Sequence, residues 1–264
     1  MEKFRITVKV GSNVLTRSDG TLDVTRMSAL VDQIATLHKQ GIQVILVSSG
    51  AVACGRSILK GLQSELDEVS QRQLFSAVGQ AKLINKYYEF FNEHDIKCGQ
   101  VLTTKESLST DEQRQNQKNC METMLSHDVI PIVNENDTVS ITELMFTDND
   151  ELSGLMAQMM EANLLVLLSN IDGIYTGNPA DPSSELIRVI GTQTDVSQYI
   201  QSSKSSAGRG GMQSKHHTAR QVAASGIKVI IANGKRDNIL QDLMQVTPLN
   251  EVIVSPQVPC TIFK

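Results

Sequence analysis

The chain has 264 residues, of which 24 are Lys or Arg and 29 are Asp or Glu, so its formal net charge is −5. This mildly acidic balance excludes nucleic-acid binding as the main activity, because such a surface needs a basic footprint. Hydrophobic residues make up 40% of the chain, which is enough for a sizeable core and too many for a disordered protein. We therefore expect a globular protein that acts on small molecules and not on nucleic acids.

The cysteines and the N-terminus indicate the compartment. Cys54, Cys98, Cys120 and Cys260 lie far apart and form no C-x-x-C pair, which predicts reduced thiols and neither a disulfide framework nor a zinc site. The first residues enter a short strand pattern without the apolar core of a signal peptide. No run approaches the ~20 apolar residues that a membrane-spanning helix needs. We expect a cytoplasmic protein with no membrane contact.

The chain alternates short apolar runs with longer segments of helical periodicity. We predict strands at residues 4–10, 42–47, 97–102, 129–133, 164–168 and 228–232, and helices at 24–40, 71–93, 111–126 (with Asp111 as N-cap), 148–161 and 212–225. Residues 171–184, with several Gly and Pro, predict a long loop, and the tail segments 252–254 and 261–263 predict an edge pair. This strand–helix repetition predicts an α/β fold with a mainly parallel sheet and helices on both faces. We expect a single domain over residues 1–264.

Small and polar residues follow four of the predicted strands. Ligands collect at the carboxyl ends of strands in open parallel sheets, so these residues predict a site at one edge. The alternative is that loops are simply polar. The residues are Gly11 and Ser12 after the first strand, Ser49 after the second, Asn134 to Asp137 after the fourth, and Ser169 and Asn170 after the fifth.

Two lysines are candidate anion ligands, although the chain has neither a G-x-x-x-x-G-K-[ST] nor a G-x-G-x-x-G motif. Lys9 lies inside the first strand, where a buried cation is costly unless it meets an anion. The alternative is an edge strand with Lys9 in solvent. Lys215 lies one turn into a helix that follows Gly210 and Gly211, and such an entry suits an anion.

Asp148, Asn149 and Asp150 stand at the start of a predicted helix. One interpretation is ordinary capping with acids that stabilise the helix dipole. The other is that one carboxylate orients the lysines or a magnesium ion while Asn149 binds substrate. His216 and His217 are adjacent, so they point about 100° apart on a helix and cannot chelate one metal together. We interpret both as surface or packing residues.

Six segments, taken together, resemble one known family: VKVGSNVL at 8–15, VSSGAV at 47–52, AVGQ at 77–80, VNEND at 133–137, TDNDELS at 147–153 and GGMQSK at 210–215. They resemble the glutamate 5-kinase (gamma-glutamyl kinase) family of the amino acid kinase superfamily, in order from about residue 4 to the C-terminus. The resemblance implies the amino acid kinase fold, a three-layer αβα sandwich with a mainly parallel open sheet. It also implies ATP-dependent phosphorylation of the γ-carboxylate of L-glutamate to glutamyl 5-phosphate, the first step of proline biosynthesis.

The resemblance also assigns residues to roles. It implies that Lys9 and Lys215 contact the transferring phosphoryl group and that Asp150 orients both lysines. Glutamate would be held by Ser49, Asp137 and Asn149, with Asn134 supporting the loop and Asp137 suited to the α-ammonium group. The nucleotide would lie beside Lys9, Gly11, Ser12, Ser169, Asn170 and the run Arg209, Gly210, Gly211, Met212, Gln213, Ser214 and Lys215.

The family chemistry implies ATP and Mg²⁺ as cofactors, with the magnesium held by nucleotide phosphates and water and by no protein ligand set. It further implies feedback inhibition by proline and a homo-oligomer, either a dimer or a tetramer. We expect a short form without the family's C-terminal PUA-type domain. Arg209 stands where a small residue is usual, Ser169-Asn170 where Thr-Asp is common, and Cys260 where a Gly is expected.

Two alternatives remain at this point. The first is another kinase of the superfamily, acting on aspartate, N-acetylglutamate, carbamate or a nucleoside monophosphate, against which the segment from Asn134 to Asp150 favours glutamate. The second is a non-catalytic sensor of glutamate or proline. The presence of Lys9, Asp150 and Lys215 together argues against a sensor, which has no need of both lysines.

Overall fold

The computed structural model describes residues 3–60, 66–140, 148–191, 193–200, 211–247, 252–255 and 257–264. Eight strands form one sheet in the order β3-β4-β2-β1-β5-β7-β10-β6. Their bounds are β1 Arg5–Val10, β2 Gln43–Ser48, β3 Lys97–Thr103, β4 Val129–Glu135, β5 Leu164–Ser169, β6 Val189–Ile190, β7 Lys228–Asn233 and β10 Cys260–Phe263. The strands from β3 to β7 all pair in parallel, and β10 runs antiparallel to β7.

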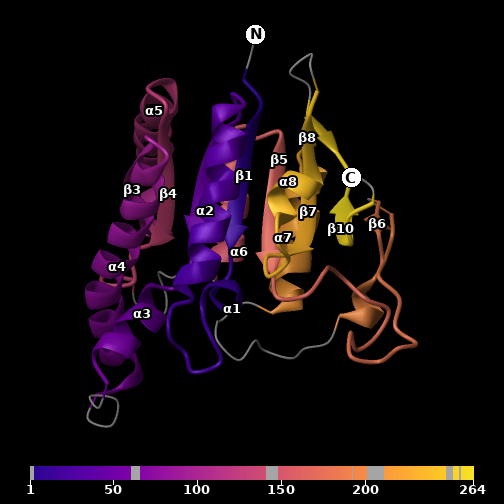
Figure 1. Ribbon diagram of the computed structural model, residues 1–264, viewed down its shortest axis with the longest axis horizontal. Coiled ribbons are helices and arrows are strands. Elements are labelled where there is room, and N and C mark those ends of the chain that lie inside the picture. Colours follow the sequence, from indigo (N-terminus) through magenta and orange to yellow (C-terminus); the bar gives the residue numbers. More distant parts are fainter. Residues whose placement is uncertain are drawn as a thin grey trace.

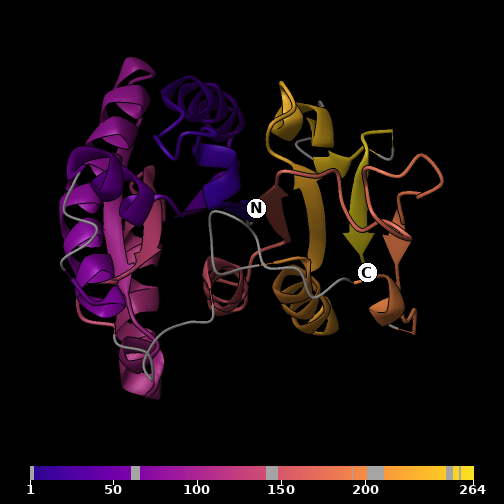
Figure 2. The same ribbon diagram turned by 90° about the horizontal axis from the view of Figure 1, so that it is seen from below.

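Helices cover both faces of this sheet. They are α1 Ser12–Leu15, α2 Val24–Lys39, α3 Ala51–Ile58, α4 Glu68–Glu93, α5 Asp111–Ser126, α6 Asn149–Met159, α7 Met212–Ala224 and α8 Ile239–Leu243. Figure 2 shows α2 on one side of the sheet and α6 and α7 on the other. The three-layer αβα sandwich with a mainly parallel sheet is confirmed. Within the described part of the chain, no helix combines the length and apolar character that a membrane span requires.

The alternation of side chains along β1 determines which of them face each helical layer. Ile6, Val8 and Val10 pack with the helices of the α2 layer in one core cluster. Successive side chains of a strand point to opposite faces, so Lys9 faces the α6 layer. Because β1 lies between β2 and β5 in the sheet, the edge-strand interpretation of Lys9 is wrong.

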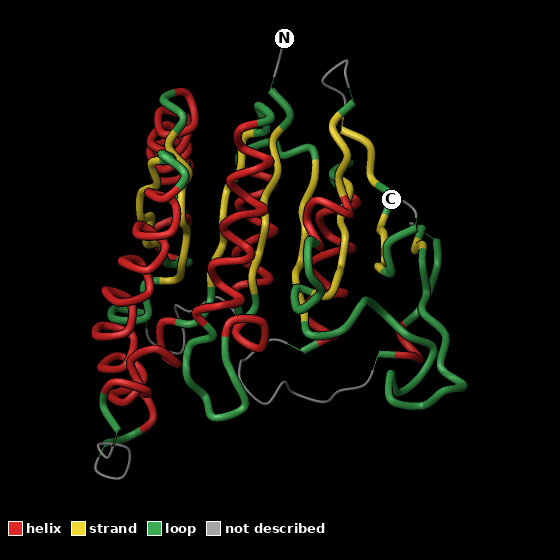
Figure 3. The backbone as a smooth tube through the Cα atoms, in the orientation of Figure 1, coloured by secondary structure: helices red, strands yellow, loops and turns green. Residues whose placement is uncertain are grey.

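The carboxyl ends of the parallel strands lie at one edge of the sheet. The arrowheads of β4 and β5 point to the lower edge in Figure 1, and loops connect the strands to the helices there in Figure 3. The predicted rim of polar residues therefore occupies a single edge, as expected for parallel strands.

The predicted strands and helices are present, with ends that differ by a few residues. The N-cap of α5 is Thr110 and not Asp111, because the Thr110 hydroxyl accepts from the Gln113 amide at 3.2 Å within a capping box. The tail segments do not pair with each other. Instead Val252–Val254 (β9) pairs with Met244–Val246 (β8) in a separate two-stranded sheet, and β10 extends the main sheet.

Helices α3 and α4 cross at unusually short range. A Cβ atom on Gly79 of α4 would lie 1.8 Å from the Ala51 carbonyl oxygen, and one on Gly55 of α3 would lie 1.8 Å from the Phe75 carbonyl oxygen. Only glycine permits this backbone contact. Gly50, which precedes α3, has φ +113°, a conformation that other residues rarely adopt. The loop at the end of β2 is thereby fixed against α4.

Candidate active site

Lys9, Asp150 and Lys215 form a buried charge cluster at the carboxyl edge of the sheet. The Lys9 Nζ atom lies 2.6 Å from Asp150 Oδ1, and the Lys215 Nζ atom donates to Asp150 Oδ2 at 2.9 Å. The Asp150 side chain is fully buried, and the lysine side chains are 5% and 9% exposed. Three elements distant in sequence, β1, α6 and α7, supply the three groups.

The charges of this cluster do not balance. Burial lowers the pKa of Lys9, and the nearby Asp150 carboxylate opposes that change. Burial alone would raise the pKa of Asp150, but Lys9 and Lys215 outweigh it and hold the pKa below its ordinary value. Lys9, Lys215 and Asp150 carry two positive charges and one negative, and the nearby Asp148, which also interacts with Lys9, has a pKa raised by burial. The cluster therefore favours an additional anion such as a phosphoryl group.

The backbone next to Lys9 passes close to the neighbouring strand. The Gly11 amide donates to the Leu168 carbonyl oxygen at 3.3 Å, and a Cβ on Gly11 would lie 3.3 Å from both that oxygen and Lys9 Nζ. Ser12 begins α1 directly afterwards. On the neighbouring strand, Ser169 ends β5 and its hydroxyl donates to Asn170 Oδ1 at 3.4 Å. These four predicted nucleotide residues therefore lie at the ends of two adjacent strands.

The start of α7 supplies the second lysine. Gly211 is the N-cap without a side-chain capping bond, and Lys215 follows one turn later. Met212 is partly buried and packs against the core cluster beneath α7, whereas Gln213 is exposed. Ser214 forms a side-chain hydrogen bond to Asp148. The predicted residues Arg209 and Gly210, and the stretch from 202 to 206, lie outside the described residues.

The predicted glutamate residues meet around Asn149. Its Nδ2 atom lies within hydrogen-bonding distance of three oxygens: Ser49 Oγ at 2.9 Å, Asn134 Oδ1 at 2.9 Å and the Ser48 carbonyl at 3.3 Å. Because Asn149 and Asp150 are the first two residues of α6, one helix start joins the amino acid residues to the lysine cluster.

Asp137 lies apart from Asn149 and contacts α4 instead. The Arg72 guanidinium forms an ion pair with Asp137 Oδ1 and lies 3.3 Å from Glu135 Oε2. The Ser76 hydroxyl donates to Asp137 Oδ2 at 3.4 Å. Burial raises the pKa of Asp137, and Arg72 partly opposes this.

Sequence reasoning missed the contribution of α4. Besides Arg72 and Ser76, Gln80 accepts from Asn134 Nδ2 at 2.8 Å, and the Tyr87 hydroxyl shares a 2.8 Å hydrogen bond with Ser48 Oγ. A signal was present in the polar residues spaced by four from 72 to 80, which share one helix face. Their partners are distant in sequence, so the spacing alone does not reveal the contacts.

Asp148 caps α6, as one of the two interpretations predicts, whereas Asp150 does not act as a cap. Asp148 Oδ1 accepts from the amides of Asp150 at 2.8 Å and Glu151 at 3.1 Å, as an N-cap does. Burial, and then the neighbouring Asp150, raise the pKa of Asp148. The two acids at the start of one helix thus have different environments and different partners.

The donor set suits a metal ion that arrives with a nucleotide. Both oxygens of Asp150 are engaged by lysines. Across the residues that the structure describes, no group of three or more His, Cys, Asp or Glu side chains could hold an ion. Mg²⁺ keeps several waters and is often bound through substrate phosphates, so an ion here would be held chiefly by those phosphates while Asp150 stays engaged by the lysines.

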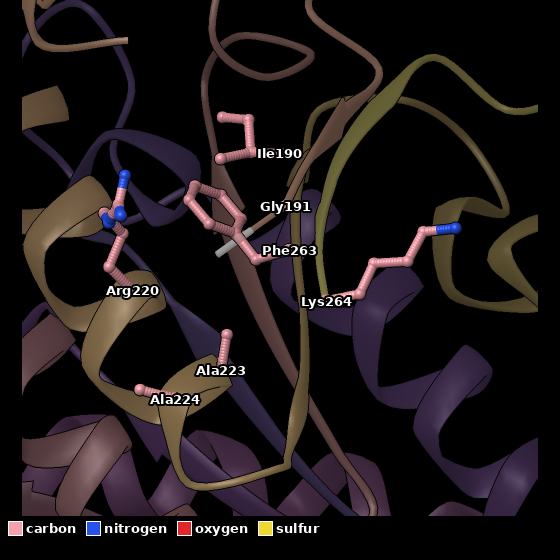
Figure 4. Close-up of a pocket in the computed structure, with 7 residues that line it drawn as sticks. All are labelled: Ile190, Gly191, Arg220, Ala223, Ala224, Phe263 and Lys264. Atoms are coloured by element: carbon pink, nitrogen blue, oxygen red, sulfur yellow. The ribbon is translucent and has the colours of Figure 1, made fainter. Parts of the chain in front are cut away.

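A separate pocket lies between α7 and the β10–β6 edge (Figure 4). Phe263, which lines it, pairs with Val229 near the start of β7, at the opposite end from the predicted site. The His216 ring lies 6.0 Å from the Phe263 ring, whereas His217 is exposed, which confirms the packing and surface interpretations. The lining residues are Ile190, Gly191, Arg220, Ala223, Ala224, Phe263 and Lys264.

Comparison with known proteins agrees with this geometry. The family model described as "Amino acid kinase family" matches residues 5–233. The chain is 69% identical to a glutamate 5-kinase of Bacteroides thetaiotaomicron over 92% of this chain and 68% of the relative. It is 46% identical to a glutamate 5-kinase of Chlorobaculum tepidum over 90% of this chain and 66% of the relative. The chain therefore spans about two thirds of the length of these relatives.

Among solved structures, the UMP kinase of Ureaplasma parvum superposes with a TM-score of 0.63 at 19% identity, covering 100% of both chains. At that identity the likeness shows the fold alone. The family model and the two relatives go further than the fold. The chain belongs to the amino acid kinase family and, within it, to the glutamate 5-kinases.

Proposed function

We propose that this protein transfers the γ-phosphoryl group of ATP to the γ-carboxylate of L-glutamate, producing glutamyl 5-phosphate for proline biosynthesis. The observation that carries the proposal is the Lys9–Asp150–Lys215 cluster, placed one residue from Asn149. The lysine cluster and the amide and hydroxyl groups around Asn149 thus meet at the start of α6. Glutamate 5-kinase relatives at 69% and 46% identity support the choice of acceptor.

On the donor side, Lys9 and Lys215 neutralise the charge of the transferring phosphoryl group. Asp150 holds both ammonium groups in place, because each contacts a different oxygen of its carboxylate. Gly11 and Ser12 bring backbone near the phosphates, and Ser169 and Asn170 lie beside the nucleotide. Positioning and electrostatic stabilisation account for most of the catalysis in phosphoryl transfer.

On the acceptor side, Ser49 and Asn149 bind glutamate, Asn134 orients Asn149 through the 2.9 Å hydrogen bond, and Asp137 receives the α-ammonium group. The γ-carboxylate is ionised at neutral pH, so the transfer needs no strong general base. Magnesium, when bound with ATP, supplies further neutralisation of the phosphate charge.

We extend the proposal to the organisation of the protein. We propose that residues 1–264 belong to one domain, and the sheet that continues from β3 to β6 supports this. The protein acts in the cytoplasm as a dimer or tetramer, and proline inhibits it. The compartment, the oligomeric state and the inhibition rest on family resemblance. Gel filtration with light scattering tests the oligomeric state, and assays with added proline test the inhibition.

The deciding experiment is trapping of the acyl phosphate with hydroxylamine in the presence of ATP and magnesium. Glutamate, aspartate, N-acetylglutamate and a reaction without amino acid are compared. We expect glutamyl hydroxamate with glutamate alone. Product with aspartate but not glutamate would reject the acceptor assignment. No product with any amino acid, despite ATP binding by calorimetry, would favour a nucleoside-monophosphate kinase or a non-catalytic sensor.

A further inference from the structure

One face of α4 lies against the predicted amino acid site. Arg72 contacts both Asp137 and Glu135, and one turn later Ser76 donates to the other oxygen of Asp137. Another turn later, Gln80 accepts from Asn134 at 2.8 Å. Residues four apart are neighbours on a helix surface, so these three side chains form one row.

The position of this row is fixed by backbone contact and not only by side chains. Gly79 and Gly55 allow α4 and α3 to touch, and α3 begins directly after the loop that carries Ser49. The same helix therefore sets where Asp137 lies and limits where Ser49 lies. A residue on α4 can influence glutamate binding without contacting glutamate.

The charges at Arg72 explain why a cation is needed there. The side chains of Glu135 and Asp137 are 5% and 10% exposed, and that of Arg72 is 19% exposed. A buried carboxylate is costly unless it is paired and hydrogen-bonded. Arg72 lies between both carboxylates, and a guanidinium has several donors in a fixed plane with which to engage two acceptors.

We propose that Arg72 is a positioning residue of the amino acid site, which holds the Asp137 carboxylate in the orientation that receives the α-ammonium group of the substrate. This inference rests on the proposed function. Its action runs through Asp137: the guanidinium and the Ser76 hydroxyl each hold one carboxylate oxygen, so the carboxylate is oriented before substrate arrives. Preorganised groups bind more tightly because less order is lost on binding.

The test compares Arg72→Gln and Arg72→Lys with wild type, and uses Lys82→Gln as a matched control, because Lys82 is an exposed cation of the same helix. Kinetic constants for glutamate and for ATP are measured by hydroxamate trapping. We expect Arg72→Gln to raise the glutamate KM about tenfold, while kcat and the ATP KM change less than about threefold. We expect Arg72→Lys to raise the glutamate KM by less than Arg72→Gln does, and Lys82→Gln to have the kinetic constants of wild type.

A double-mutant cycle identifies the path of the effect. If Arg72 acts through Asp137, then Arg72→Gln adds little to the glutamate KM of Asp137→Asn, since the two fold-changes do not multiply. Fold-changes that multiply would overturn the proposal, because Arg72 would then act directly on the substrate. An unchanged glutamate KM in Arg72→Gln, or an equal rise in the ATP KM, would also overturn it.

Two further controls keep the test decisive. If Arg72→Gln does not fold, as judged by thermal unfolding, then Arg72→Lys and Ser76→Ala take its place, with smaller increases confined to the glutamate KM. Assays of the wild-type protein distinguish a failure of the proposed reaction from a failure of the proposed role of Arg72. Absence of glutamyl hydroxamate from wild type contradicts the proposed reaction, and glutamate binding by calorimetry then replaces KM as the measure of Arg72.

Discussion

Lys9 and Lys215 bind opposite oxygens of a single buried carboxylate, at 2.6 and 2.9 Å. One lysine belongs to the first strand and the other to the seventh helix, so the pair exists only when both halves of the sheet are assembled. Asp150 reduces the repulsion between the two ammonium groups. In the proposed reaction it also fixes the direction from which both ammonium groups would meet the phosphoryl group.

Lys215→Ala is expected to lower kcat by at least about a hundredfold with a small change in the glutamate KM. An interaction made in the transition state affects turnover more than ground-state binding. Initial rates at saturating ATP measure the effect. Lys228→Ala, at an exposed lysine of β7, is the control, and a normal kcat in Lys215→Ala would remove Lys215 from the catalytic residues.

Asp137→Ala is expected to raise the glutamate KM at least tenfold. It removes a hydrogen bond between charged groups, which contributes about 1.5–3 kcal/mol, and about 1.4 kcal/mol corresponds to tenfold in affinity. Steady-state kinetics with each substrate varied provide the measurement, with Asp242→Ala as an exposed control. A change in the ATP KM alone would show that the Asp137 loop does not bind the amino acid.

The acid limb of the pH profile is expected above the ordinary aspartate range. Burial raises the pKa of Asp137 above 3.8, although Arg72 opposes the change. The carboxylate must be charged to bind an ammonium group, so kcat/KM for glutamate falls as the pH drops through that raised pKa. The profile is measured for wild type and Asp137→Asn. An identical acid limb in both would rule out Asp137 as its origin.

Gly79→Ala is expected to destabilise the protein by about 3 kcal/mol, the upper end of the usual cost of overpacking, since a methyl group 1.8 Å from the Ala51 carbonyl oxygen must separate α3 from α4. For a chain of this size, that corresponds to a fall in Tm of roughly 6–12 °C. Thermal unfolding followed by circular dichroism measures it. Gly191→Ala is the control, because its nearest neighbour would be at 3.6 Å, and an equal Tm for both variants would contradict the packing argument.

Chelation of magnesium is expected to stop turnover without lowering the Tm of the nucleotide-free protein. This expectation follows from the proposal that magnesium binds together with the phosphates of ATP and has no part in the fold. Activity and Tm are measured with and without a chelator, and added excess magnesium restores activity. A lower Tm on chelation would indicate a structural metal.

The local features of this protein were predictable from sequence because they depend on near neighbours. Apolar runs and helical periodicity located β1, β5 and α7, and the cost of burying Lys9 indicated an anion partner. The N-cap of α5 was misplaced by one residue because Thr110 and Asp111 are both good caps, and only the hydrogen bond to Gln113 distinguishes them.

The remaining features depend on which segments become neighbours in space. The antiparallel insertion of β10 between β7 and β6 leaves no periodic signal in a four-residue strand. The four-residue spacing of Arg72, Ser76 and Gln80 did not identify their partners, since Glu135 ends β4 and Asp137 follows it, far from α4 in the sequence. The residues predicted to contact ligand were suggested by motif, whereas Arg72, the proposed positioning residue, was found only from the contacts of α4.

The strand order separates the residues predicted to bind the acceptor from those predicted to bind the phosphate donor. The predicted acceptor residues lie at the ends of β2 and β4 and at the start of α6, on the side of α3 and α4. The predicted donor residues lie at the ends of β1 and β5 and at the start of α7, and α6 carries residues of both sets, Asn149 and Asp150. If the proposed site is correct, substitutions along α4 are expected to alter which acceptor is held, while the half predicted to bind phosphate keeps its geometry. For protein engineering, α4 is the element on which to redesign acceptor choice, and its glycine contact with α3 is the boundary that such redesign has to preserve.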